Sequence, residues 1–593
     1  MVIPASRSRF SRLVRVSADL IKDQEQGPQR LVKAVLYLWQ KASYPLLVVR
    51  APYGTSALLK EEAVRQFSKW LQDQNFNDAA YWLSSAYAQW VGDDLRSKQS
   101  LYFTPPKLAD RVIDDLVSRG ASLTSDHWHD PACGGAAFLV PTAQRMAVAL
   151  SEIGQSPKQI VKTIANQLSG NDLDETLLSV CEQFLLMALY SIVNASGITP
   201  TFKLKNIDGL LAKYQNAERP DVIVCNPPYR KLNAFETRKY EADYREVMRN
   251  QPNIYGLFIR KTLDVVKEGG LVGLLTPTSF LSGASFSKLR TSLLSRAHVL
   301  QVDMLSDRTS MFISVLQETV ITVLKTTSSP VSAKGSTDIN VLNSIGAYQH
   351  VGSLKLHDGG GPWSIPRSVE DSELIHTSNN RRARLSDYGY VAKVGHLVTY
   401  RDKRKRFPAR PKSSLSLCIV PIVWAGDIST GSFEHGRIHQ KQRSDYFVEV
   451  SAHDHVSVIS TPSVVLQRLT SNDQNNRLIA APVPEVWQLL NGGFVAENHV
   501  IVLQTFLGNA WSPTMMASLL NSPLINRLFR AISGAPNVAI SELNELPLPD
   551  PTEFRNALNK FNDTNTAVCQ AFGSSEKDKE KSSLHQELLP AIA

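Results

Sequence analysis

A run of four apolar residues near the middle of the chain leads directly into two consecutive prolines. The run is Val222-Ile223-Val224-Cys225, and it continues into Asn226-Pro227-Pro228-Tyr229. A short, continuous apolar run is typical of a strand that is buried on both faces of a parallel sheet. Proline cannot donate to a sheet ladder, so the strand is expected to end here. Doubly wound α/β folds place their sites at the carboxyl ends of strands, and the sequence therefore predicts a site at this loop.

The side chains of this loop suit a reaction at an aromatic amine, which is a poor nucleophile because its lone pair is delocalised into the ring. The Asn226 side-chain oxygen and the Pro227 carbonyl are candidate acceptors for such an amine, while Pro228 helps to fix the backbone direction. Acceptors held in place act without a titrating base. Tyr229 offers a flat face on which a planar base can stack. A rigid turn, in which Asn226 caps and Tyr229 packs, is the structural alternative.

Upstream of this loop, acidic residues follow expected strands at the positions that a nucleotide-like cofactor requires. Small residues after Asp130 (Pro131-Ala132-Cys133-Gly134-Gly135-Ala136) let the backbone turn sharply toward a ligand. Asp172 ends the next strand and is the first candidate for ribose hydroxyls, with Asp174 second. A helix N-cap is the alternative role for either acid. Asp208 is a candidate acceptor for a cofactor's adenine amino group, although Asp-Gly is also a common turn.

The periodicity divides the chain into regions. Residues 1–98 are expected to be helical, and helical spacing is clearest in Gln29–Trp39, Lys60–Leu71 and Ala79–Trp90. Residues 99–325 alternate short apolar runs with helical segments, which predicts a doubly wound α/β sheet. Its strands are expected to end at Asp130, near Asp172 and just before Asn226, and to include Leu271–Leu275 and Val320–Leu324. No GxxxxGK[ST] loop is present in the sequence, so nucleotide hydrolysis is disfavoured.

A second region follows a candidate linker. Thr326–Asp338 is rich in Ser, Thr, Pro and Lys, and a further break lies at Asp358–Pro362. Residues 340–550 contain many short strand-like runs and are expected to form a C-terminal mixed α+β domain. Residues 551–593 are expected to form a C-terminal tail, of which Gly573–Ser583 is highly charged.

The positive charge of the chain is concentrated in one segment. Between Arg381 and Arg443 there are fourteen Lys and Arg against four Asp and Glu, a balance of +10, whereas the whole chain carries +9. The remainder is therefore close to neutral. Such a segment is a common feature of phosphate-binding surfaces, and a solvated loop is the alternative. Arg401, Arg404, Lys405 and Arg406 are the leading candidates for phosphate contacts, with Lys403 among them.

Cysteine usage and hydropathy favour a cytoplasmic protein without a metal site or a membrane segment. The five cysteines are widely spaced and form no CxxC pair, which disfavours a zinc site and suits free thiols in a reducing compartment. The most apolar run, Phe184–Val193, is too short for a membrane span and is expected to be a buried helix. The N-terminal arginines are not followed by an apolar stretch, so a secretory signal is not expected.

In the content and order of its motifs, the chain resembles the gamma-type N6-adenine DNA methyltransferases of bacterial restriction–modification systems over about residues 100–325. The resemblance implies S-adenosyl-L-methionine (SAM) as cofactor, with the methionine end near Thr104 and a binding loop at Asp130-Pro131-Ala132-Cys133-Gly134. It also implies Asp172 as the ribose acid and Asp208 as the adenine acid. One departure is Ala136, where the family usually has a second glycine; we expect activity to be retained.

For the acceptor side, the resemblance implies that Asn226-Pro227-Pro228-Tyr229 is the catalytic loop and that Phe312 packs against a flipped adenine. It further implies double-stranded DNA as partner, target recognition by residues 340–550, and a cognate restriction endonuclease that acts on the same sequence. Three alternatives share features of this pattern: a methyltransferase of protein glutamine or of RNA, a bifunctional restriction enzyme, and an inactive DNA-binding regulator. The first hundred residues contain no convincing nuclease motif, which disfavours the second.

Overall fold

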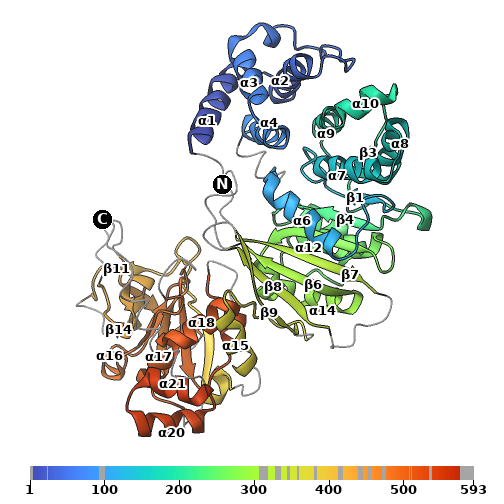
Figure 1. The fold of residues 1–593 in the computed structure, drawn as a ribbon. Coiled ribbons are helices and arrows are strands. Elements are labelled where there is room, and N and C mark those ends of the chain that lie inside the picture. The colour runs from blue at the N-terminus through green and yellow to red at the C-terminus, as the bar shows by residue number, and fades with distance from the viewer. Residues whose placement is uncertain are drawn as a thin grey trace. The chain divides into compact units, whose positions relative to one another are not determined.

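The structure is a computed structural model. It describes residues 4–22, 24–92, 101–305, 318–327, 335–342, 347–356, 359–378, 383–411, 418–437, 445–451, 454, 456–470, 476–506, 508, 510–532 and 537–573. The chain forms two compact units (Figure 1). Unit 1 comprises Met1–Phe280 and Lys288–Gly360, and unit 2 comprises Leu281–Ser287 and Gly361–Ala593.

Unit 1 begins with helices, as the periodicity predicts: α1 Pro4–Ala18, α2 Gly27–Ser43, α3 Glu62–Gln72 and α4 Phe76–Trp90. Each has an apolar face, and α4 is buried along most of its length. These helices share one hydrophobic core with the sheet that follows, and this core runs from Phe10 to Leu342. The helical region is therefore part of unit 1 and has no separate core.

The centre of unit 1 is a nine-stranded sheet in the order β3-β2-β1-β4-β5-β7-β6-β8-β9. Strands β3, β2, β1, β4 and β5 run parallel, and β7 is antiparallel to both β5 and β6. The strands are β1 Trp128–Asp130, β2 Leu168–Asp172, β3 Lys203–Asn206, β4 Val222–Cys225, β5 Leu271–Pro277, β6 Ala297–Met304, β7 Thr319–Thr326, β8 Thr337–Leu342 and β9 Tyr348–Leu354. This confirms the doubly wound α/β sheet and the strands expected from the sequence.

The helices of this part of unit 1 connect the strands and pack against them (Figure 1). They are α6 Pro106–Ser118, α7 Leu139–Glu152, α8 Pro157–Gln167, α9 Glu175–Ala188, α10 Tyr190–Ser196, α11 Ala234–Tyr244, α12 Ile254–Val265, α13 Ser279–Ser282, which spans the boundary with unit 2, and α14 Ser287–Arg296. The run Phe184–Val193, expected to be one buried helix, is divided between α9 and α10 at Leu189.

The edge of the sheet extends further along the chain than the sequence predicts. Strand β8 pairs with β6 in parallel, and β9 pairs with β8. Residues 337–354 fall across the predicted linker, Thr326–Asp338, and the predicted C-terminal domain, residues 340–550. Their burial against the sheet, with Ile339 fully buried, is a tertiary effect that local composition does not reveal. The other predicted boundaries, at 98 and 550, remain predictions.

Unit 2 is mixed α+β and contains two main sheets, in the orders β10-β20-β17-β18 and β11-β15-β12-β19-β16, and a small β13-β14 pair. Its strands are β10 Tyr390–Val394, β11 Arg406–Phe407, β12 Cys418–Val423, β13 Ile428–Ser429, β14 Ser432–Phe433, β15 Phe447–Val450, β16 Val458–Ile459, β17 Ser463–Gln467, β18 Ala480–Pro482, β19 Phe494–Ala496 and β20 Val500–Thr505. Its helices are α15 Val369–Ser378, α16 Glu485–Leu490, α17 Pro513–Asn521, α18 Pro523–Ile532, α19 Ile540–Glu545, α20 Pro551–Phe561 and α21 Thr564–Phe572.

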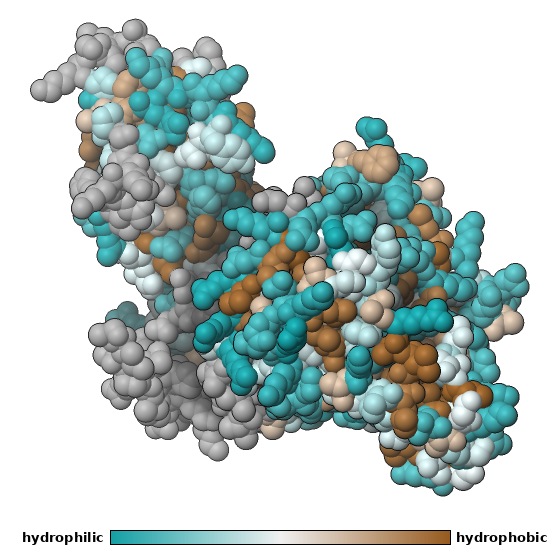
Figure 2. Space-filling view, turned by 90° about the horizontal axis from the view of Figure 1, so that it is seen from above, coloured by the Kyte–Doolittle hydropathy of each residue, from teal (hydrophilic) through white to brown (hydrophobic). Residues whose placement is uncertain are grey.

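Helices α17–α21 pack with the first of these sheets in a core that includes Phe529 and Phe554. The face drawn in Figure 2 carries mostly hydrophilic side chains, and its hydrophobic side chains gather in a few patches. Within the described ranges, no single helix is long and apolar enough to cross a membrane, although the bent pair α9 and α10 passes a test of length and composition.

Candidate active site

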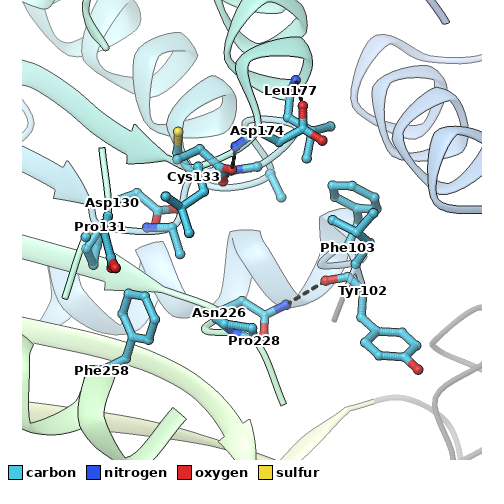
Figure 3. A pocket seen from close by; sticks show the side chains of 18 of the residues that line it. Tyr102, Phe103, Asp130, Pro131, Cys133, Asp174, Leu177, Asn226, Pro228 and Phe258 are labelled. Carbon is cyan, nitrogen blue, oxygen red and sulfur yellow. Dashed lines mark hydrogen bonds between the residues drawn. The ribbon is translucent and has the colours of Figure 1, made fainter. Parts of the chain in front are cut away.

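A cavity of about 490 Å³ lies at the carboxyl edge of the unit 1 sheet. This volume falls within the roughly 300–1,000 Å³ typical of small-molecule sites. In Figure 3, Asn226 and Pro228 face the cavity from the side opposite Cys133 and Asp174, and Phe258 lies beside Pro131. The lining includes these sequence-predicted residues: Thr104, Asp130, Pro131, Ala132, Gly134, Asp172, Asp208, Asn226 and Pro228. Residues from five separate motifs thus meet in one place.

The loop after β1 is held by backbone contacts to its neighbours. Asp130 is buried and accepts a hydrogen bond from the Ala132 amide at 2.9 Å. The Cys133 amide donates to the Asn171 carbonyl at 2.9 Å. A Cβ at Gly209 would lie 2.1 Å from the Pro131 carbonyl oxygen, so only glycine permits this approach. Burial raises the pKa of Asp130 to about 8. A cationic ligand would favour its ionised form.

Asp172 and Asp174, the two candidates for the ribose acid, have different roles in the structure. Asp174 is the N-cap of α9 and accepts from the amides of Thr176 and Leu177. Asp172 lies at the cavity and accepts from the Gly134 amide and the Asp174 amide, each at 2.8 Å. The capping role considered for both acids therefore applies to Asp174. Burial raises the pKa of Asp172 to about 6, and a carboxylate retains acceptor capacity beyond two backbone bonds.

Ala136 adopts a backbone conformation that normally requires glycine. Its φ is +62°, in the left-handed region, and its side chain is buried. A left-handed conformation costs about 1–2 kcal/mol for a residue with a Cβ. The backbone bonds Ala136 N to Cys133 O and Val140 N to Ala136 O hold it in place, and the latter leads into α7. The loop therefore holds an alanine in a left-handed conformation at the position where it departs from the family pattern.

Asp208 also lines the cavity, but its carboxylate has protein partners. Lys239 and Tyr240 of α11 donate to Oδ2 at 2.7 and 2.9 Å, and the Leu210 amide donates to Oδ1 at 3.1 Å. The ion pair with Asp208 raises the pKa of Lys239. Neither Lys239 nor Tyr240 was predicted from the sequence. Because they lie more than thirty residues downstream, on a helix of weak amphipathicity, no local pattern could have pointed to them.

Asn226 follows β4, and its amide is oriented by the segment before α6. Its Nδ2 donates to the Thr104 hydroxyl at 2.9 Å and lies 3.4 Å from the Tyr102 carbonyl oxygen. A carbonyl oxygen only accepts, so the contact with Tyr102 assigns the nitrogen side of the amide. Asn226 Oδ1 accepts from the Tyr229 hydroxyl. Thr104, predicted to lie near the methionine end of SAM, therefore also holds the orientation of Asn226.

The remaining loop residues differ in exposure. Pro228 lines the cavity, whereas Pro227 is buried. The Tyr229 hydroxyl contacts the Leu275 carbonyl oxygen of β5 at 2.9 Å as well as Asn226. One hydroxyl proton cannot serve both acceptors at once, so Tyr229 can release Asn226 Oδ1 and keep its bond to Leu275. Stacking on a base by Tyr229 remains a prediction. Phe312 lies outside the described residues, and its predicted role remains open.

Several cavity residues were not predicted from the sequence. Phe103, Ile254 and Phe258 provide apolar walls, while Gln29 and Arg230 provide polar ones. Arg230 is held by a bidentate pair with Glu236, at 2.6 and 2.7 Å. Phe103 adjoins the predicted Thr104 and therefore had a sequence signal. Gln29 had none, because it belongs to the N-terminal helices.

The predicted phosphate contacts of the basic segment lie together in unit 2, and half of them have acidic partners. Arg404 binds Asp402 and Asp454, with shortest distances of 2.6 and 3.1 Å. Arg406 binds Asp445 at 2.6 Å. Arg401 lies over the ring of Tyr400, and Lys405 lies over that of Phe407. Side chains 401, 403 and 405 are exposed, whereas 404 and 406 are half-buried. Exposed and half-buried side chains thus alternate along the segment that leads into β11.

The described residues contain no cluster of three or more His, Cys, Asp or Glu that could hold a metal ion. Their polar groups fit SAM better: buried acids suit a cationic sulfonium ligand with an ammonium group and ribose hydroxyls. The side chain of Gln29 also lines the cavity. SAM would be held by the loop after β1, by Asp172 and by Asp208.

Two features define the class of fold. The sheet has an antiparallel β7 beside five parallel strands, and the site lies at the carboxyl edge of those strands. The chain has the fold of the SAM-dependent methyltransferases. The profile of the Eco57I restriction-modification methylase family matches residues 166–312, a range that includes Asp172, Asp208 and Asn226. Over this range the chain is therefore similar to the methylases of restriction–modification systems.

Two curated relatives are similar over much of the chain. Type II methyltransferase M.PstI of Providencia stuartii is 23% identical over 407 residues, which cover 67% of this chain and 75% of the relative. Type II methyltransferase M.BsuBI of Bacillus subtilis is 24% identical over 360 residues, covering 59% and 68%. The solved structure of the Type IIL restriction-modification enzyme MmeI in complex with DNA matches with a TM-score of 0.53 at 12% identity, covering 97% of this chain and 90% of that one. This last similarity concerns the fold alone.

Proposed function

We propose that this protein is a site-specific DNA (adenine-N6) methyltransferase that uses SAM. The observation that carries the proposal is the orientation of Asn226: Thr104 and Tyr102 occupy its amide nitrogen, so its oxygen is directed to accept. An exocyclic amine donates hydrogen bonds to such an oxygen. Acceptors that are fixed in advance stabilise the more tetrahedral nitrogen that forms as the amine attacks.

Each residue of the loop has a defined task in this proposal. SAM supplies an electrophilic methyl group when bound. Asn226 Oδ1 and the Pro227 carbonyl accept from the amine. Tyr229 gives up its bond to Asn226 and keeps its bond to the Leu275 carbonyl. The new N–CH3 bond would form as the S–CH3 bond of SAM breaks, and the cationic amine would then release its proton to solvent, because the partners of the Asn226 amide nitrogen, Thr104 and Tyr102, include no group that takes up a proton.

Duplex DNA is the proposed substrate, and the target adenine leaves the helix because its amine is out of reach inside the stack. The exposed basic residues of unit 2 are the proposed phosphate contacts, and contacts to base edges would set the recognition sequence. In a restriction–modification system, the modification would protect host DNA from a cognate endonuclease that acts on the same sequence.

Transfer of a radiolabelled methyl group from SAM to duplex DNA, followed by nucleoside analysis, tests the proposal. We expect label in N6-methyladenine. Label in cytosine would contradict adenine specificity. Label in added RNA or release-factor protein, but not in DNA, would favour the alternative methyltransferases, and SAM binding without transfer to any of them would favour a regulator.

A further inference from the structure

Asp208 reaches the cavity beside an apolar part of its wall. The next residue, Gly209, packs so closely that an added Cβ would lie 2.1 Å from the Pro131 carbonyl oxygen and 3.4 Å from the Phe258 ring. Phe258 lies beside Pro131 in Figure 3, and Ile254 lines the same cavity. An apolar wall with one carboxylate beside it suits a flat ring that carries an N–H donor. Within SAM, only the adenine has this combination.

The hydrogen bonds of Asp208 divide its two carboxylate oxygens. Lys239 Nζ and the Tyr240 hydroxyl both donate to Oδ2, at 2.7 and 2.9 Å. The Leu210 amide donates to Oδ1 at 3.1 Å. A carboxylate has about four lone-pair sites, two on each oxygen. Lys239 and Tyr240 therefore occupy Oδ2, and the acceptor site that is left for a ligand lies on Oδ1.

Helix α11, which carries Lys239, is held beside the cavity by further contacts. Near its start, Glu236 pairs with Arg230, which lines the cavity. At its last residue, the Tyr244 hydroxyl donates to the Leu210 carbonyl at 2.6 Å. Because these contacts do not involve Lys239, whose side chain is 38% exposed, α11 should stay in place when Lys239 is replaced.

We propose that Lys239 and Tyr240 are positioning residues of the cofactor site, which direct Asp208 Oδ1 toward the exocyclic amine of the SAM adenine. This inference rests on the proposed cofactor. With Oδ2 held, the carboxylate cannot turn that oxygen toward the ligand, and its open acceptor site suits one N–H donor. A purine without the amine leaves this acceptor unpaired and binds less tightly. Helix α11, which follows the Asn226–Tyr229 loop, is thus also part of the cofactor site.

Isothermal titration of the full-length protein with two ligands tests this inference. One is S-adenosyl-L-homocysteine, which is SAM without its transferable methyl group, and the other is its 6-deamino analogue, in which hydrogen replaces the exocyclic amine. We expect the wild type to prefer the first ligand by about tenfold or more. Lys239→Met should lower this preference by about threefold or more, and Tyr240→Phe should also lower it. The control Arg238→Met removes an exposed cation of α11 that does not line the cavity, and it should keep the preference.

An Asp208→Ala background tests whether Lys239 acts through Asp208. In this background the two ligands should bind about equally, and adding Lys239→Met should change neither affinity further. In the wild-type background, equal weakening of both ligands by Lys239→Met would indicate a structural role and overturn the inference, as would an unchanged preference.

The wild-type titrations separate failure of the inference from failure of the proposed cofactor. A wild-type protein that binds both ligands equally tightly would overturn the inference and leave the cofactor in place. A wild-type protein that binds neither ligand would overturn the proposed cofactor, and the inference with it.

Discussion

The carboxyl edge of the unit 1 sheet and the basic segment of unit 2 both carry polar residues that the sequence singles out, but the two regions hold them differently. At the sheet edge, Asp130, Asp172 and Asn226 are buried or half-buried, and their partners are backbone groups or neutral side chains. In the basic segment, Arg404 and Arg406 bind carboxylates, while residues 401, 403 and 405 are exposed. The function and stability of the sheet edge should therefore depend on pH and on the loss of single hydrogen-bonding groups. DNA binding by the basic segment should depend on salt concentration.

A polar residue that belongs to a functional sequence pattern is therefore a better guide to the binding site at the sheet edge than in the basic segment. A residue at the end of a buried strand has its direction set by the strand and its loop. A residue in a charged run finds whichever opposite charge folding brings near, here Asp445 and Asp454 some forty to fifty residues away. The exposed members of the run are therefore better candidates for DNA contacts than the ion-paired ones.

The largest expected effect concerns the sheet edge. Asn226→Ala removes the oriented acceptor and should lower kcat for methyl transfer by about 10²–10³-fold, in the range seen when one preorganised hydrogen-bonding group is removed. Affinity for SAM should change little, because the adenine and ribose acids are untouched. Single-turnover assays with titrations of SAM separate the two quantities. A variant that transfers methyl groups at the wild-type rate would show that the loop acts only as a structural turn.

The second prediction concerns pH. Burial lowers the pKa of His129 to about 3 and that of His127 to about 4. The contribution of these neutral histidines to the free energy of unfolding is fully present above their unfolded pKa of about 6.5. It is lost as the pH falls below that value, by up to about 1.4 kcal/mol per pH unit for each histidine. Hydrogen exchange of the β1 amides at pH 7 and 5, corrected for intrinsic rates, measures this loss.

The matched variant for this prediction is His129→Gln, because burial of Asp130 and Asp172 has the opposite pH dependence and remains in both proteins. The stability lost by β1 between pH 7 and 5 should be smaller in the variant by about 2 kcal/mol. Equal losses in the two proteins would mean that His129 is not held neutral by burial. Exchange in β12 of unit 2 serves as the internal reference.

The third prediction separates the exposed and ion-paired members of the basic segment. Replacing Arg401, Lys403 and Lys405 by alanine should weaken DNA binding at low salt and reduce the salt slope by about one for each phosphate that is no longer bound, without lowering the melting temperature. Replacing Arg404 and Arg406 should cost up to about 1 kcal/mol of stability per ion pair and change the slope less. Fluorescence anisotropy across a salt series measures the slope. A larger slope change in the second variant would reverse the assignment.

The smallest effect is expected at Ala136. Ala136→Gly relieves a left-handed alanine, worth about 1–2 kcal/mol, but removes a buried methyl group and adds backbone freedom to the unfolded chain, which together cost a similar amount. The free energy of unfolding should change by less than about 1 kcal/mol, and SAM affinity should be kept. Urea denaturation with titration of SAM checks both. A loss above about 2 kcal/mol would show that the methyl group is required for packing.

The sequence predicted what short local patterns encode and missed what folding brings together from a distance. Strands β1, β2, β4 and β5 and the residues at their ends were predictable because a buried strand and its exit loop are contiguous. The pairing of β8 and β9 with the sheet was missed, because the Ser- and Thr-rich segment before β8 indicates a linker and pairing with a distant strand leaves no local pattern. Lys239, which binds Asp208, and Gln29, which lines the cavity, lie on helices distant in the chain from the motifs of the site, so no local pattern could point to them.

The most direct test of the central claim is long-read, modification-sensitive sequencing of DNA from cells that express the wild-type protein or Asn226→Ala. Methyl transfer to adenine through an oriented Asn226 predicts N6-methyladenine at one fixed recognition sequence with the wild type and none with the variant. Methylation at another base, or the same adenine methylation with Asn226→Ala, would contradict it.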